Sequence, residues 1–196
     1  METEELKAGI IKSLLKIAKT GDKEKGAIVV LGGCPSYKLL RKNNINPFYI
    51  LDELTLFENL CEMDGAVIID EKGMLKDYAV MLETNKVFVN YGTRHSASIS
   101  TSLQKEVIYV FLASASEKKV KIFKEGKMVM QIDAFEKDIE KKVSEISHFL
   151  EGAGVSGLVG AGAVYFGMIG VTVLSGVIVF GGGAYYLLKK LGVIKK

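Results

Sequence analysis

The sequence predicts an α/β (α+β) head with a central mixed β-sheet flanked by helices, followed by an uncharged C-terminal segment. Helical and strand patterns alternate over the first half of the chain, and strand patterns then dominate. Alternating elements that give way to a run of strands are typical of a mixed sheet with helices on its faces. Every charge disappears between Gly152 and Leu188. We therefore divide the chain into a head, residues 1–150, and a glycine-rich tail, residues 151–196, with a basic C-terminus.

The first half of the head supplies two helices around a buried strand. Apolar residues at helical spacing predict an amphipathic helix over residues 4–19 and a second helix over about 51–63. Between them, the β-branched run at 27–31 ends in two glycines and predicts a buried strand. Residues 34–49 are rich in proline and asparagine, so we expect an irregular connection there.

The second half of the head is dominated by strand patterns. Extended or apolar runs predict strands at 66–69, 74–82, 86–89 and 107–113, and a hairpin of 120–123 with 127–130. Two helices complete the prediction: one over 94–104, and a charged one over 134–150 with Asp133 as its cap.

The charge distribution argues against broad nucleic-acid binding by the head. The whole chain carries a net charge of +3, and four lysines follow Leu188, so residues 1–151 carry a net charge of −1. Sequence-independent binding to nucleic acid needs a basic face. We therefore expect no nucleic-acid partner.

Two short motifs bring together residues suited to phosphoryl chemistry. Asp64-Gly65-Ala66 lies between a predicted helix and a strand, and Gly92-Thr93-Arg94-His95 opens a predicted helix. Each motif alone has an ordinary explanation, as a turn and as a capped helix start. Together they offer a carboxylate for a metal or an attacking hydroxyl, and a cation beside helix-terminal amides for phosphates. His95, one of only two histidines, is a candidate metal or phosphate ligand.

At these motifs the chain resembles the diadenylate cyclase (DAC) domain, in particular the branch of the DNA-integrity scanning proteins and their archaeal relatives. The order of elements matches: a helix, Asp64-Gly65-Ala66 with a strand, Leu82, Gly92-Thr93-Arg94-His95, and a strand that ends in Ser114. Residues 26–32 and 58–70 are similar to two core segments of that family. The likeness extends over about residues 5–131.

The resemblance implies that two such domains, each with one ATP, face each other and condense the two ATP molecules into cyclic di-AMP and diphosphate. Asp64, Arg94 and His95 would be catalytic, and Asp64 and His95 would hold a divalent metal ion, Mn²⁺ or Mg²⁺. The ATP-binding residues would be Gly65, Ala66, Leu82, Gly92, Thr93, Arg94, His95 and Ser114, with Leu82 against the adenine.

The chain departs from the family pattern at three places, of which the first, at Ser96, favours an alternative function. Ser96 stands where the family usually has a second arginine, Ala115 follows Ser114 where many members have glutamate, and a usual proline before Gly92 is missing. The alternative is a catalytically inactive membrane sensor that binds ATP or cyclic di-AMP.

The uncharged composition of the tail predicts that it attaches the protein to a membrane. Residues 152–188 form 37 residues without charge, and 11 of the 21 glycines fall there. A membrane-spanning helix needs roughly 20 apolar residues, so the run allows one helix or a helical hairpin. The acidic start Met1–Glu5 does not resemble a secretory signal. We therefore expect a membrane protein with its head in the cytoplasm, in contact with lipid and self-associating.

Overall fold

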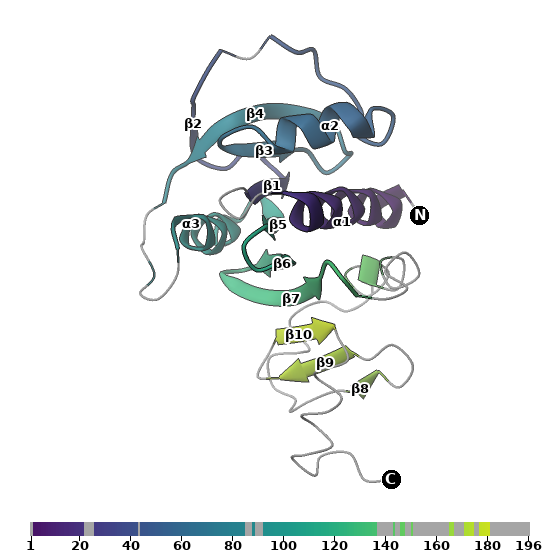
Figure 1. The fold of residues 1–196 in the computed structure, drawn as a ribbon. Coiled ribbons are helices and arrows are strands. Elements are labelled where there is room, and N and C mark those ends of the chain that lie inside the picture. The colour runs from purple at the N-terminus through teal and green to yellow at the C-terminus, as the bar shows by residue number, and fades with distance from the viewer. Residues whose placement is uncertain are drawn as a thin grey trace, which may run out of the picture.

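A computed structural model describes residues 2–21, 26–42, 44–84, 88, 92–136, 143, 146–147, 150, 165–166, 171–174 and 177–180. Its helices and strands are α1 (Glu2–Thr20), β1 (Gly26–Gly32), β2 (Tyr37–Leu39), α2 (Leu54–Cys61), β3 (Ala66–Ile69), β4 (Leu75–Leu82), α3 (Thr93–Ser102), β5 (Val107–Ser114), β6 (Lys119–Lys124), β7 (Lys127–Asp133), β8 (Tyr165–Phe166), β9 (Val171–Leu174) and β10 (Val177–Phe180). The strands form one sheet in the order β2-β4-β3-β1-β5-β6-β7-β10-β9-β8 (Figure 1).

The sheet is mixed, as predicted. β1 runs parallel to β3 and antiparallel to β5, and β5, β6 and β7 follow one another as antiparallel neighbours. The central pairing is in register from Gly26 opposite Ser114 to Leu31 opposite Tyr109. This pairing brings the start of β1, the end of β5 and the start of β6 to the same end of the sheet.

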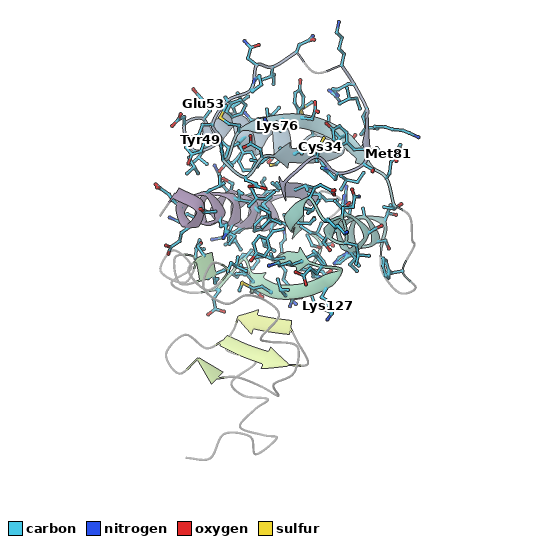
Figure 2. All side chains as sticks on the ribbon, turned by 180° about the vertical axis from the view of Figure 1, so that it is seen from behind. Cys34, Tyr49, Glu53, Lys76, Met81 and Lys127 are labelled. Carbon is cyan, nitrogen blue, oxygen red and sulfur yellow. The ribbon has the colours of Figure 1, made fainter. Side chains whose placement is uncertain are left out.

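Helices cover the two faces of the sheet, so the central strand β1 is buried on both sides (Figures 1 and 2). Val29 and Leu31 join the core under α1 and α2, whereas Ile28 and Val30 join the core under α3. Successive side chains of a strand point to opposite faces, which explains this division. The continuous β-branched run in β1 is typical of a strand with two covered faces.

Most elements of the head agree with the prediction, with two corrections. The short strand β2 falls within a segment expected to be irregular, and it is held by antiparallel pairing with β4. The charged helix predicted over 134–150 is helical at its described residues Val143, Ile146, Ser147 and Leu150, but residues 134–136 do not begin it. Asp133 instead accepts a hydrogen bond from the backbone N–H of Phe135 at 2.9 Å and forms a turn. The predicted strand at 86–89 lies outside the described residues except for Phe88, which is not in a strand.

The described residues of the tail are strands, which corrects the helical conformation expected there. β10 extends the sheet by parallel pairing with β7, and β9 and β8 follow as antiparallel neighbours. These segments are rich in β-branched residues, such as Val171-Thr172-Val173 and Val177-Ile178-Val179, whose side chains favour strands. Within the described ranges, no helix has both the length and the apolar character needed to cross a membrane.

Candidate functional site

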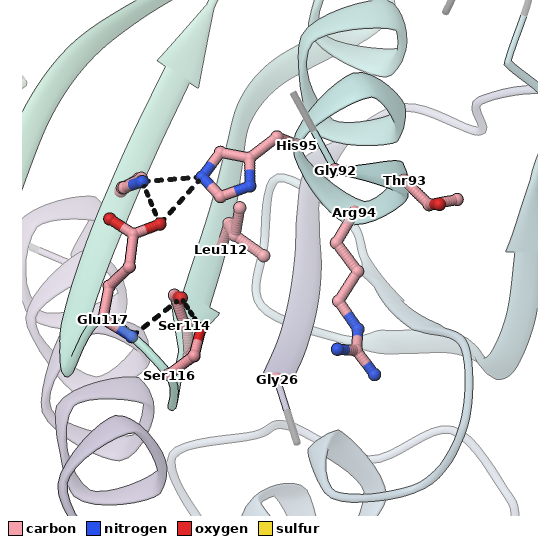
Figure 3. Close-up of a pocket in the computed structure, with 11 residues that line it drawn as sticks. Gly26, Gly92, Thr93, Arg94, His95, Leu112, Ser114, Ser116 and Glu117 are labelled. Atoms are coloured by element: carbon pink, nitrogen blue, oxygen red, sulfur yellow. Dashed lines mark hydrogen bonds and ion pairs between the residues drawn. The ribbon is translucent and has the colours of Figure 1, made fainter. Parts of the chain in front are cut away.

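A pocket of about 780 Å³ opens at the end of the sheet where β1 begins and β5 ends (Figure 3). Pockets for small molecules commonly have volumes of about 300–1,000 Å³. Its walls come from the start of β1, the first turn of α3, the end of β5 with the following turn, and β6. The lining residues are Gly26, Gly92, Thr93, Arg94, His95, Leu112, Ala113, Ser114, Ser116, Glu117 and Lys121.

The first turn of α3 supplies one wall of this pocket. Gly92 is the N-cap residue, with φ −66° and ψ 166°, and the N-cap has no side-chain hydrogen bond. The carbonyl of Gly92 accepts the first helical hydrogen bond, from the N–H of Ser96 at 3.0 Å. The preceding N–H groups of a helix have no partner within the helix and suit an anion.

Arg94 lies against the start of β1. A Cβ atom added to Gly26 would come 3.4 Å from Cδ and 3.5 Å from Nη1 of Arg94. It would also come 2.8 Å from the carbonyl oxygen of Ala113. The close approach of the Ala113 carbonyl therefore favours glycine at this position, and the exposed Arg94 side chain lies in van der Waals range of it.

A second, smaller pocket of about 250 Å³ adjoins the first and contains the other motif. Asp64 and Gly65 line it, and it shares Gly26 and Arg94 with the larger pocket. Gly65 has φ +104°, and a Cβ atom there would lie 2.7 Å from both N and O of Val80. Only glycine fits this turn, so the backbone of β4 fixes how the Asp64 segment approaches Arg94.

His95 has two charged neighbours on the other side of the pocket. Its Nε2 lies 2.7 Å from Nζ of Lys121 and 3.6 Å from Oε1 of Glu117, and Lys121 is 2.7 Å from the same carboxylate oxygen (Figure 3). An ammonium group can only donate, so the imidazole Nε2 accepts. The ring also makes an edge contact with Phe123, with the centroids 6.4 Å apart.

The surroundings of these groups favour a neutral histidine and an ionised glutamate. Burial, followed by the charge of Lys121, lowers the pKa of His95, and Glu117 opposes this shift. Burial alone would raise the pKa of Glu117, but the hydrogen bond and charge of Lys121 outweigh it and lower this pKa. At neutral pH the group therefore consists of one ammonium shared between a carboxylate and a neutral imidazole.

The predicted site residues fall into three places. Gly92, Thr93, Arg94, His95 and Ser114 line the larger pocket, and Asp64 and Gly65 line the smaller one. Ala66 and Leu82 lie instead in the buried core on the α3 side of the sheet. The contact between Leu82 and an adenine ring therefore stays a prediction.

Ser96 has a structural role. Its side chain is 2% exposed, and its Oγ accepts a hydrogen bond from the backbone N–H of Phe88 at 3.3 Å. The position at which the resemblance led us to expect an arginine thus faces the interior of the protein.

Metal binding by Asp64 and His95 also stays a prediction. The described residues contain no group of three or more His, Cys, Asp or Glu side chains placed to hold one ion. The carboxylate of Asp64 suits Mg²⁺, which is usually held by one or two carboxylates together with substrate phosphates. His95 could use Nε2 as a ligand only after Lys121 had moved away, because Nζ lies 2.7 Å from that nitrogen.

Sequence reasoning missed Lys121 and gave Glu117 no role. Lys121 is 7% exposed, although lysine is almost never fully buried without a partner. The alternation of side chains between the two faces of a strand could have identified Lys121. Val120 and Ile122 belong to the core under α1, so Lys121 must point to the opposite face, where Phe123 joins the core under α3.

The fold and the site define an α/β domain whose pocket combines helix-terminal amides with cationic side chains, an arrangement suited to a nucleotide's phosphates. The family model described as "DisA bacterial checkpoint controller nucleotide-binding" (DAC) matches residues 16–128. This match covers more than half of the chain. The chain therefore belongs to the DAC family, a diadenylate cyclase-type family of nucleotide-binding domains.

Two solved structures are similar to this chain at low identity. A hypothetical membrane spanning protein from Bacillus cereus is 17% identical with a TM-score of 0.45, covering 61% of this chain and 59% of that one. A double cysteine mutant of DacA from Staphylococcus aureus is 19% identical with a TM-score of 0.47, covering 72% of this chain and 95% of that one. The chain thus spans less than two thirds of the Bacillus cereus protein. No curated protein matches it.

Proposed function

We propose that this protein is a diadenylate cyclase, which condenses two ATP molecules into cyclic di-AMP. The observation that carries the proposal is the convergence of two distant motifs on Arg94. The Asp64 segment and the first turn of α3 line adjoining pockets that share Gly26 and Arg94. A carboxylate and a guanidinium thus lie at the same end of the sheet, in a domain of the DAC family.

The proposed reaction forms two phosphodiester bonds. The 3′-hydroxyl oxygen of each ATP attacks the α-phosphorus of the other, and the bond from that phosphorus to the β-phosphate oxygen breaks. Two pyrophosphates leave, and the two hydroxyl protons pass to solvent. Because each hydroxyl must reach the other nucleotide, two domains have to face each other with one ATP in each.

Five of the site residues have a proposed role in this reaction. The amides of Gly92 and Thr93 and the guanidinium of Arg94 bind phosphate oxygens, and Ser114 contributes a hydroxyl at the end of β5. Asp64 orients the attacking 3′-hydroxyl and holds a Mg²⁺ or Mn²⁺ ion. Such an ion supplies neutralisation of the phosphate charge when it is bound.

Nucleotide binding without turnover is the second candidate function. It is favoured by Ser96, which is buried and bonded to the Phe88 backbone, so that the second residue after Arg94 offers no cation to the pocket. A protein of this kind would bind ATP or cyclic di-AMP and produce neither cyclic di-AMP nor pyrophosphate.

The proposal includes membrane attachment of the head through residues 152–188, which carry no charge. Confinement to a surface raises the effective concentration of weakly pairing heads. Specific activity should therefore fall on dilution in detergent and be retained in lipid vesicles. If dilution leaves the specific activity unchanged in both detergent and vesicles, the tail does not act by promoting pairing of heads. Recovery of the protein in the soluble fraction of cells would count against membrane attachment.

The direct test is incubation of the purified full-length protein with ATP and Mg²⁺ or Mn²⁺, with mass spectrometry of the products. We expect cyclic di-AMP from the wild type and none from Asp64→Asn. Binding of a non-hydrolysable ATP analogue without any cyclic product would favour the second candidate instead.

A further inference from the structure

Lys121 occupies an unusual place for a lysine, on the face of β6 that turns toward the pocket. Its side chain is 9% exposed, and it lines the pocket together with Arg94 and His95. Its neighbour on the same face of the strand, Phe123, is 1% exposed in the core. A cation in such a place is costly unless it has partners.

The two partners of Lys121 do not use all three of its hydrogen-bond donors. Nζ contacts Oε1 of Glu117 and Nε2 of His95, each at 2.7 Å. An ammonium group has three donors. Two of them are therefore used within the described structure, and the third is available to a ligand in the pocket.

Glu117 is a partner that can move away. It lies in the turn between β5 and β6, and its side chain is 41% exposed at the edge of the pocket. A half-exposed ion pair contributes little to stability, so exchanging this carboxylate for another anion costs little.

Arg94 and Lys121 approach the pocket from different sides. The Arg94 side chain points toward Gly26, away from Glu117 and His95, which are the residues that Lys121 contacts (Figure 3). A chain of phosphates between them would meet a cation on each side. In the free protein, Glu117 neutralises one of these two charges.

We infer that Lys121 is a second phosphate-binding residue, and that Glu117 holds its ammonium group in the free protein and gives it up to the phosphates of the bound nucleotide. This inference rests on the proposed function and adds a specificity-determining pair to the same site. Lys121 provides attraction for the phosphates, and Glu117 competes with them for the same ammonium.

If Glu117 and the phosphates compete for Lys121, substitutions of Lys121 and of Glu117 should change the Kd of the nucleotide in opposite directions. Lys121→Gln should raise the Kd for a non-hydrolysable ATP analogue about 10–100-fold, because a charged hydrogen bond to phosphate is lost. Glu117→Gln should lower that Kd about 2–5-fold, because a competing carboxylate is removed. Adenosine has no phosphates, so its Kd should change less than about twofold in either variant.

The experiment is calorimetric titration of the full-length protein with the ATP analogue and with adenosine, at one fixed Mg²⁺ concentration. Lys127→Gln is the matched control, because Lys127 is an exposed lysine at the start of β7, outside the pocket (Figure 2). Lys121→Arg keeps the charge and should retain most of the affinity for the analogue.

Several results would overturn the inference alone. They are an unchanged Kd for the analogue in Lys121→Gln, an equal loss of analogue and adenosine binding, or weaker analogue binding in Glu117→Gln. If Lys121→Gln does not fold, the sign of the Glu117→Gln effect decides. A wild-type protein that does not bind the analogue would instead overturn the proposed function, and the inference with it.

Discussion

The substitution Ser96→Arg tests whether the first turn of α3 has room for a second cation. Ser96 is 2% exposed and its Oγ accepts the N–H of Phe88, so an arginine there must either be buried or displace the helix. Loss of the hydrogen bond costs about 0.5–1.5 kcal/mol, and overpacking adds about 1–3 kcal/mol. We expect a total loss of about 2–4 kcal/mol in the free energy of unfolding.

Urea unfolding of the wild type, Ser96→Arg and Ser96→Ala measures this effect. Alanine removes only the hydroxyl, so Ser96→Ala should lose about 1 kcal/mol. Because the same helix turn binds phosphate in the proposed function, Ser96→Arg should also weaken binding of the ATP analogue. A Ser96→Arg protein with wild-type stability and tighter binding of the analogue would refute this reasoning.

Three further predictions concern the site and the head. Asp64→Asn should abolish formation of cyclic di-AMP with unchanged circular dichroism, since Asp64 is exposed and asparagine keeps its turn preference; undiminished turnover would remove Asp64 from the mechanism. Arg94→Ala should raise the Kd of the ATP analogue about 10–100-fold in calorimetry, and an unchanged Kd would contradict its phosphate role. Asp70→Asn should lower the free energy of unfolding by about 1 kcal/mol at pH 7, because Asp70 accepts the N–H groups of Lys72 and Met74 and pairs with Lys76 at 3.0 Å.

The Asp70 effect has a defined pH dependence. Burial alone would raise the pKa of Asp70, but the hydrogen bond from Met74 and the pairing with Lys76 outweigh it and lower the pKa. The carboxylate therefore stabilises the fold above its unfolded pKa of about 3.9, and this stabilisation is lost as the pH falls through the lower folded pKa. The difference between wild type and Asp70→Asn should shrink on acidification, and a difference independent of pH would contradict this account.

Elements with strong local patterns were predictable from the sequence. The β-branched run of β1 and the amphipathic α1 have periodicities that match their burial, and both were expected within two residues of their observed bounds. The strand β2 was not predictable, because three residues of mixed polarity are held by pairing with β4 rather than by their own pattern. The strands of the tail are not predictable from its composition, because a long uncharged segment fits a membrane-spanning helix as well as buried strands.

The residues of the candidate site that belong to sequence motifs were predictable. Those that only the fold brings together were not. Asp64, Arg94 and His95 were chosen from sequence, and the structure brings Asp64 and Arg94 to one pocket wall. Lys121 belongs to no motif, and it reaches His95 only because β6 pairs with β5 and α3 packs against both strands. The role of Ser96 depends on its burial, which the sequence pattern did not show.

The measurement that tests the central claim most directly is the stoichiometry of the products from the full-length protein with ATP and a divalent metal ion. Chromatography and a pyrophosphate assay on the same reaction give the amounts of cyclic di-AMP, pyrophosphate, ADP and inorganic phosphate. Condensation of two ATP molecules predicts two pyrophosphates for each cyclic di-AMP and no ADP. Production of ADP and phosphate, or ATP binding without pyrophosphate release, would contradict the assignment of this domain as a diadenylate cyclase.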